Sequence, residues 1–194
     1  SGVGGGRGRC VEAGRGTSRF LGRAREIKEL EAWLGQRLPI TIVGTAGIGK
    51  SRLAEELCAR WSGESAVAAM ANERDEAGCI AKIARALDLA GATEADVTRA
   101  LAARGQMVLW LDDADHAIEF VASFVEDLRV HAPEVRLLVT SRERLRLRHE
   151  RLLVLEPLSS EHGADSEAYA LLEDRLAAQT GVVLDEERKL ALLR

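Results

Sequence analysis

A glycine-rich octapeptide between an apolar run and an amphipathic stretch constrains the fold of this 194-residue chain more than any other feature. It reads Gly44-Thr45-Ala46-Gly47-Ile48-Gly49-Lys50-Ser51 and fits the pattern GxxxxGK[ST]. Its glycines let the backbone turn so that successive N–H groups point inward at an anion. A helix that begins near Lys50 points the positive end of its dipole to the same place. The sequence therefore predicts a phosphate-binding turn between a strand and a helix.

The last two residues of the octapeptide carry side chains suited to a nucleoside triphosphate. Lys50 supplies a mobile ammonium group for the β- and γ-phosphates, and Ser51 offers a hydroxyl ligand to Mg²⁺. We expect ATP or ADP with Mg²⁺ as the ligand, held by residues 44–51 together with Arg52. The plain alternative is a glycine turn without a ligand. It is disfavoured because an apolar strand precedes the loop and an amphipathic helix follows it.

Apolar runs of strand length alternate with amphipathic helical stripes over residues 20–157. The predicted strands are Ile40–Val43, Ala66–Ala71, Met107–Leu111, Val135–Thr140 and Leu152–Leu155. The helical stripes are Ile27/Leu30/Leu34, Leu53/Leu57/Trp61, Ile80/Ile83/Leu87 and Ile118/Val121/Val125/Leu128, and Thr93 is a predicted helix N-cap. Strands that are apolar on both faces and alternate with helices are typical of an α/β fold. We therefore predict a five-stranded parallel sheet flanked by helices.

Two aspartates follow the apolar run Val108–Leu111, which places their carboxylates at the carboxyl end of a buried strand. In open α/β sheets that edge is where ligands bind. Asp112 is predicted to hold Mg²⁺ through water, and Asp113 to polarise an attacking water molecule. A simple N-cap of the following helix is the alternative role for Asp113.

A third polar segment, Thr140-Ser141-Arg142, follows the apolar run Leu137–Val139 and is expected at the same sheet edge. Arg142 is suited to bidentate contact with a γ-phosphate. The predicted catalytic residues are thus Lys50, Asp113 and Arg142. For the four arginines that follow, a solvated face is favoured over contact with a protein or nucleic acid partner. These four are Arg144, Arg146, Arg148 and Arg151.

Composition and segment boundaries complete the organisation. The net charge of −4 and pI of about 5.7 give no whole-chain attraction to nucleic acid or an anionic membrane. Three cysteines far apart in sequence indicate reduced thiols and a cytoplasmic location. Residues 1–19, rich in glycine and arginine, are predicted to be a flexible linker or a cloning remnant. Residues 20–157 form the predicted nucleotide-binding domain, and 158–194 begin a second, incomplete helical unit.

Several of these segments together resemble the STAND class of signal-transduction ATPases, which includes NB-ARC proteins. The resemblance rests on Phe20-Leu21-Gly22-Arg23, the phosphate-binding loop, Asp112-Asp113, Val139-Thr140-Ser141-Arg142 and Leu155-Glu156-Pro157-Leu158. It covers roughly residues 20–180. It is strongest, over Arg136 to Leu158, with the ATPase modules of bacterial transcriptional regulators of the AfsR and LuxR types.

The resemblance implies residue roles and a mode of action. Leu21, Gly22 and Arg23 would lie beside the adenine and ribose, and Arg142 would be the sensor arginine. The segment from Leu155 would lead into a helical lid. Members are switches that ADP holds closed and that ATP, with an inducer, opens for self-association, while hydrolysis is slow. The implied partners are further domains of the same polypeptide, with nucleic acid contacted only through a domain outside this chain, and no membrane.

The sequence departs from the family pattern at two sites within the chain. Asp113 stands where the bacterial branch often has asparagine, and Arg148-His149-Glu150 lacks the glycine usual after the arginine-rich turn. The lid's Gly-x-Pro motif and winged-helix histidine are not found, so we expect ADP affinity weaker than submicromolar. Two other functions stay open: a motor or loader ATPase of the AAA+ type, and a non-hydrolysing nucleotide-binding interaction module.

Overall fold

The computed structural model describes residues 22–157, and these fall into two compact units. The first contains residues 26–155 and carries the whole sheet. The second includes residues 22–25 and 156–157, and within it the Arg23 guanidinium donates a hydrogen bond to the Glu156 carbonyl oxygen. The predicted segments 1–19 and 158–194, together with Phe20 and Leu21, lie outside the described residues. The predicted domain boundaries therefore stay predictions.

Five parallel strands form one sheet in the spatial order β2-β3-β4-β1-β5, which confirms the predicted five-stranded parallel sheet. The strands are β1 (Ile40–Val43), β2 (Glu64–Ala69), β3 (Met107–Asp112), β4 (Arg136–Ser141) and β5 (Arg151–Val154). The register places Val43 opposite Ser141 and Ala69 opposite Asp112. The carboxyl ends of β1, β3 and β4 therefore meet at one edge, as the sequence predicted.

Helices and strands alternate along the chain except at two places: two helices lie between β2 and β3, and none lies between β4 and β5. The helices are α1 (Ala24–Leu34), α2 (Lys50–Arg60), α3 (Glu76–Ala86), α4 (Glu94–Arg104) and α5 (Ile118–His131), with a 3-10 turn η1 (Ala114–His116) before α5. The predicted N-cap of α4 is confirmed, because the Thr93 hydroxyl accepts from the backbone N–H of Asp96 and the Asp96 carboxylate accepts from the Thr93 N–H. None of the described helices has the length and hydropathy needed to cross a bilayer.

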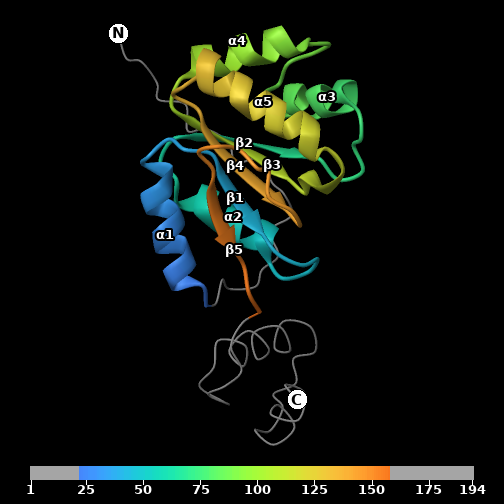
Figure 1. Cartoon of the computed structure of the whole chain (residues 1–194). Coiled ribbons are helices and arrows are strands. Elements are labelled where there is room, and N and C mark those ends of the chain that lie inside the picture. Colours follow the sequence, from blue (N-terminus) through green and yellow to red (C-terminus); the bar gives the residue numbers. More distant parts are fainter. Residues whose placement is uncertain (1–21, 158–194) are drawn as a thin grey trace, which may run out of the picture. The chain divides into compact units, whose positions relative to one another are not determined.

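Side chains on alternate positions of the central strands enter two separate apolar layers. Leu109 and Leu111 of β3 pack in the core shared with α3, α4 and α5. Val108 and Trp110 are also buried, but on the opposite face of the sheet. Figure 1 shows α3, α4 and α5 together on one side of the sheet and α1 on the other. Burial on both faces explains why β3 reads as a continuous apolar run.

Strand β5 departs from this pattern although its sequence is equally apolar. Leu153 is buried, whereas Leu152 and Val154 are 36% and 60% exposed. β5 is the edge strand next to β1, so only one of its long sides has a strand partner. An apolar run in the sequence therefore does not indicate whether the strand will lie at the centre or at the edge of the sheet.

Candidate nucleotide-binding site

The loop between β1 and α2 has the backbone conformation that the octapeptide predicted. Gly47 and Gly49 have φ values of 77° and 101°, a left-handed region that strongly favours glycine. Gly44 is constrained differently, because a Cβ atom there would lie 2.9 Å from the Leu155 carbonyl oxygen. The loop thus needs glycine for its turns at two positions and for close packing at a third.

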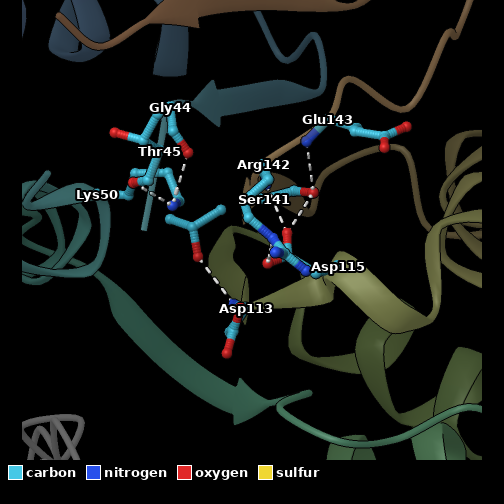
Figure 2. Close-up of polar contacts among 9 residues, drawn as sticks. Gly44, Thr45, Lys50, Asp113, Asp115, Ser141, Arg142 and Glu143 are labelled. Atoms are coloured by element: carbon cyan, nitrogen blue, oxygen red, sulfur yellow. Dashed lines mark hydrogen bonds and ion pairs between the residues drawn. The ribbon is translucent and has the colours of Figure 1, made fainter. Parts of the chain in front are cut away.

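Lys50 folds back over the loop at the first turn of α2. Its Nζ donates to the carbonyl oxygens of Gly44 at 2.9 Å and Thr45 at 3.1 Å (Figure 2). These two bonds hold the ammonium group above the turn, at the helix N-terminus where the dipole also favours an anion. Positive charge is therefore concentrated where the sequence predicted phosphate.

Ser51, Asp112 and Thr140 form a hydrogen-bonded chain that joins α2, β3 and β4. The Ser51 hydroxyl donates to Asp112 Oδ1 at 2.7 Å, and the Thr140 hydroxyl donates to the same oxygen at 2.5 Å. Thr140 Oγ1 also accepts from the backbone N–H of Asp113 at 3.0 Å. The contact between Asp112 and Thr140 was not predicted, because the sequence indicated only that Thr140 is a polar residue at the end of a strand.

The oxygens of Ser51 and Asp112 fit the expected magnesium ion. They lie within hydrogen-bond distance of each other, so one hard cation can reach both. No group of three or more His, Cys, Asp or Glu able to hold a metal occurs in the described part of the chain. Mg²⁺ in proteins commonly takes most of its ligands from phosphate and water, so two protein oxygens are compatible with its coordination.

Exchanging the Thr140 hydroxyl for a methyl group will destabilise the protein. Thr140→Val leaves the partly buried N–H of Asp113 without its partner, at a cost of about 1 kcal/mol in the free energy of unfolding. Thr41→Val on the neighbouring strand is the matched control, because Thr41 is fully buried and its hydroxyl has no hydrogen-bond partner among the described residues. Urea denaturation should show that control equal to or more stable than wild type; equal losses in both variants would contradict the assignment.

Asp113 has an unusual backbone conformation directly after β3. Its φ and ψ are 56° and 54°, in the left-handed region, and its side chain makes no capping hydrogen bond. The plain N-cap interpretation is therefore not supported. Burial, followed by the adjacent carboxylates of Asp115 and Asp112, raises the pKa of Asp113 above that of an ordinary aspartate. A carboxylate whose pKa is raised is suited to accept a proton near neutral pH.

Asp115 is a site residue that the sequence did not reveal. Its Oδ1 accepts from the Ser141 hydroxyl at 3.0 Å and from the Arg142 backbone N–H at 2.5 Å, and its Oδ2 accepts from Arg142 Nε at 2.5 Å (Figure 2). Burial opposes its ionisation, but these hydrogen bonds outweigh burial and lower the pKa of Asp115. Its position in the 3-10 turn, three residues beyond Asp112, resembled no predicted motif.

A cavity of about 240 Å³ lies where these elements meet. Its walls are formed by Ala46, Gly47, Lys50, Ser51, Ala69, Ala71, Asp112, Asp113, Asp115 and Thr140. Six of these ten were in the predicted site, and the other four are Ala69, Ala71, Asp115 and Thr140. Because one water occupies roughly 30 Å³ in the liquid, the space equals about eight waters. It is therefore large enough for a phosphate group with a hydrated cation.

Among the other predicted site residues of the first compact unit, Gly44, Thr45, Ile48, Gly49, Arg52 and Arg142 do not line this cavity. Arg52 pairs with Glu55 on α2 at 2.9 Å, and Gly22 and Arg23 belong to the second compact unit. Arg151 donates twice to Gln36 Oε1 and lies over the Trp33 ring at 5.9 Å. All four arginines of the predicted solvated face are exposed, namely Arg144, Arg146, Arg148 and Arg151.

Comparison with known sequences finds distant relatives, and no family model matches the chain. An uncharacterised protein of Mycobacterium tuberculosis, Rv0894, is 28% identical over 153 residues, which cover 72% of this chain and 37% of that protein. The "Putative HTH-type transcriptional regulator Rv0890c" of the same species is 29% identical over 136 residues, or 59% of this chain and 14% of that protein. The chain therefore spans well under half the length of either relative.

Solved structures with a similar fold include a signal-transduction ATPase and a branch migration motor. A STAND protein with a tetratricopeptide repeat sensor, PH0952 from Pyrococcus horikoshii, superposes with a TM-score of 0.55 at 20% identity over 89% of this chain and 27% of its own. The RuvB Holliday junction branch migration motor of Thermotoga maritima gives 0.55 at 15% identity over 88% and 55%. The chain thus has a P-loop NTPase fold that resembles a STAND ATPase and RuvB, with distant sequence similarity to mycobacterial proteins that include a regulator of the HTH type by name.

Proposed function

We propose that this chain is an ATP- and ADP-binding signal-transduction switch that hydrolyses ATP slowly with Mg²⁺. The observation that carries the proposal is the convergence of Lys50, the Ser51–Asp112 pair and Asp113 on one cavity at the carboxyl edge of the sheet. That edge is where ligands bind in open α/β sheets. The P-loop NTPase fold of the similar structures supports a nucleotide as the ligand.

Different residues of the site would bind the phosphates, hold Mg²⁺ and accept the proton during hydrolysis. Lys50 and the loop N–H groups would bind the phosphates, while Ser51 and Asp112 would hold Mg²⁺, which supplies charge neutralisation when bound. Asp113 would accept a proton from the water that attacks the γ-phosphorus. The bond from that phosphorus to the β,γ-bridging oxygen breaks, so that ATP and water give ADP and phosphate. Arg142 would stabilise negative charge on the transferred group.

The finer assignments follow from the resemblance to STAND proteins. Leu21, Gly22 and Arg23 would contact the adenine and ribose, and residues 158–194 would begin the lid. Similarity to much longer proteins, among them a protein named as a transcriptional regulator, supports further domains as partners in the same polypeptide. Self-association that depends on the bound nucleotide, and a cytoplasmic location, complete this proposal.

A motor of the AAA+ type is the second candidate, because the fold resembles the RuvB motor as closely as the STAND protein. The rate of ATP hydrolysis distinguishes a switch from a motor. A switch should release phosphate from Mg·ATP at a rate below about 1 s⁻¹, whereas a motor should exceed it in an assembled ring. Phosphate release measured over a range of protein concentrations makes the test. A fast hydrolysis rate that rises with protein concentration would favour the motor and contradict the proposed switch function.

A further inference from the structure

We propose that Asp115 is a positioning residue that holds Arg142 ready for the terminal phosphate and so makes the site distinguish ATP from ADP. This inference rests on the proposed function, since it assigns one selectivity to the same site. It concerns a carboxylate outside the phosphate-binding loop and outside the Asp112–Asp113 pair. Three hydrogen bonds and a large difference in exposure support it.

The Asp115 carboxylate is committed to one neighbouring segment. Oδ1 accepts from the Ser141 hydroxyl and the Arg142 backbone N–H, while Oδ2 accepts from Arg142 Nε. The Asp115 side chain is only 9% exposed, its contact with Ser141 is partly buried, and its two bonds to Arg142 lie at the exposed surface. Asp115 therefore fixes both the backbone of Arg142 and the base of its guanidinium group.

The outer part of that guanidinium group remains available. The Arg142 side chain is 52% exposed, and no hydrogen bond within residues 22–157 engages its two Nη atoms. A guanidinium presents its N–H donors in a rigid planar fork that matches phosphate oxygens. With Nε held by Asp115, the orientation of the fork is set while its outer donors stay free to bind.

The position of Asp115 relates this orientation to the phosphate site. Asp115 lines the same cavity as Lys50 and Ser51, which are the predicted phosphate and magnesium contacts. A long, exposed arginine side chain loses much rotamer freedom when it binds, and a fixed partner reduces that loss.

The competing explanation is that Asp115 only stabilises the contact between η1 and β4. The variant Asp115→Asn distinguishes this structural role from the positioning of Arg142. The asparagine Oδ1 can still accept from Ser141 and from the Arg142 N–H, but its amide group places a donor against the Nε donor. Ser141→Ala is the matched control, because it removes one bond to Asp115 and leaves the guanidinium contact intact. Asp115→Asn thus breaks the contact with the guanidinium, whereas Ser141→Ala breaks only the contact with the serine hydroxyl.

The test measures the affinities of the full chain for Mg·ATPγS and Mg·ADP by calorimetry. Asp115→Asn should weaken Mg·ATPγS about tenfold, the order expected for one charge-assisted contact, while Mg·ADP stays within about twofold. Arg142→Ala should show the same selective loss, and the double variant should lose no more than Arg142→Ala alone. Ser141→Ala should leave the ratio of the two affinities unchanged. In nitrogen-15 NMR spectra without nucleotide, the Arg142 Nε–H signal should exchange slowly with water in wild type and rapidly in Asp115→Asn.

Several outcomes would overturn the inference. Equal loss of both nucleotides in Asp115→Asn would identify a structural tie, and so would losses that add in the double variant. A fast-exchanging Nε–H signal in wild type would show that Asp115 does not hold Arg142. A wild-type chain that binds neither nucleotide would instead refute the proposed function, and this inference would fall with it even if the Nε–H signal were protected.

Discussion

Lys50→Ala will lower the affinity for both Mg·ATP and Mg·ADP about 100-fold while the chain stays folded. The ammonium group lies above the loop and bonds to the carbonyl oxygens of Gly44 and Thr45, so it is positioned for phosphate before any ligand arrives. Loss of two charge-assisted contacts at about 1.5 kcal/mol each predicts an affinity about 100-fold lower. Calorimetric titration with each nucleotide measures this loss.

Lys82→Ala is the control for this substitution. Lys82 lies on α3 and pairs with Glu73 at 3.3 Å, away from the residues that line the cavity. The same change of charge there should leave both affinities within about twofold, because an exposed ion pair contributes little. A Lys50→Ala chain that binds as well as wild type would show that the loop does not hold phosphate.

Asp113→Asn will stop hydrolysis and leave nucleotide binding nearly intact. An asparagine side chain cannot accept the proton from water, and loss of a general base lowers rates by roughly 10²–10⁴-fold. Asparagine tolerates the left-handed backbone observed at this position, so the loop geometry should persist. Single-turnover phosphate release measures the rate, and an unchanged affinity for Mg·ATP confirms that the site remains formed. A variant that hydrolyses at the wild-type rate would remove Asp113 from the mechanism.

The same role for Asp113 predicts how hydrolysis depends on pH. Burial and the neighbouring Asp115 raise the pKa of Asp113, so it becomes protonated at a higher pH than a free aspartate would. Only the ionised form accepts a proton, and hydrolysis per bound ATP should therefore decline on acidification while pH is still above about 3.9, the ordinary aspartate value. Rates that stay constant down to that value would contradict a raised pKa in the active form.

Local patterns in the sequence were enough to predict most of the fold. The apolar runs over Ile40–Val43 and Met107–Leu111 became β1 and β3, and Thr93 became the N-cap of α4. The octapeptide predicted the loop because its glycines and lysine act within eight consecutive residues. Asp112 could be placed because the carboxyl ends of parallel strands meet at one sheet edge.

Features that depend on contacts between distant residues could not be predicted in the same way. Thr140 reaches Asp112 only because β3 and β4 are paired in one particular register. Asp115 reaches Arg142 from a 3-10 turn that has no periodic signal of its own. The exposure of Val154 follows from the place of β5 at the sheet edge, which the apolar composition of that strand does not encode.

The central claim is that the cavity beside Lys50 and Asp112 binds a nucleotide with Mg²⁺. Calorimetric titration of the wild-type chain with ATPγS and with ADP, in the presence of Mg²⁺ and again with excess EDTA, tests it most directly. We predict one nucleotide per chain and weaker binding once Mg²⁺ is removed. No binding of either nucleotide at millimolar concentration, or binding that persists unchanged in Lys50→Ala, would contradict the account.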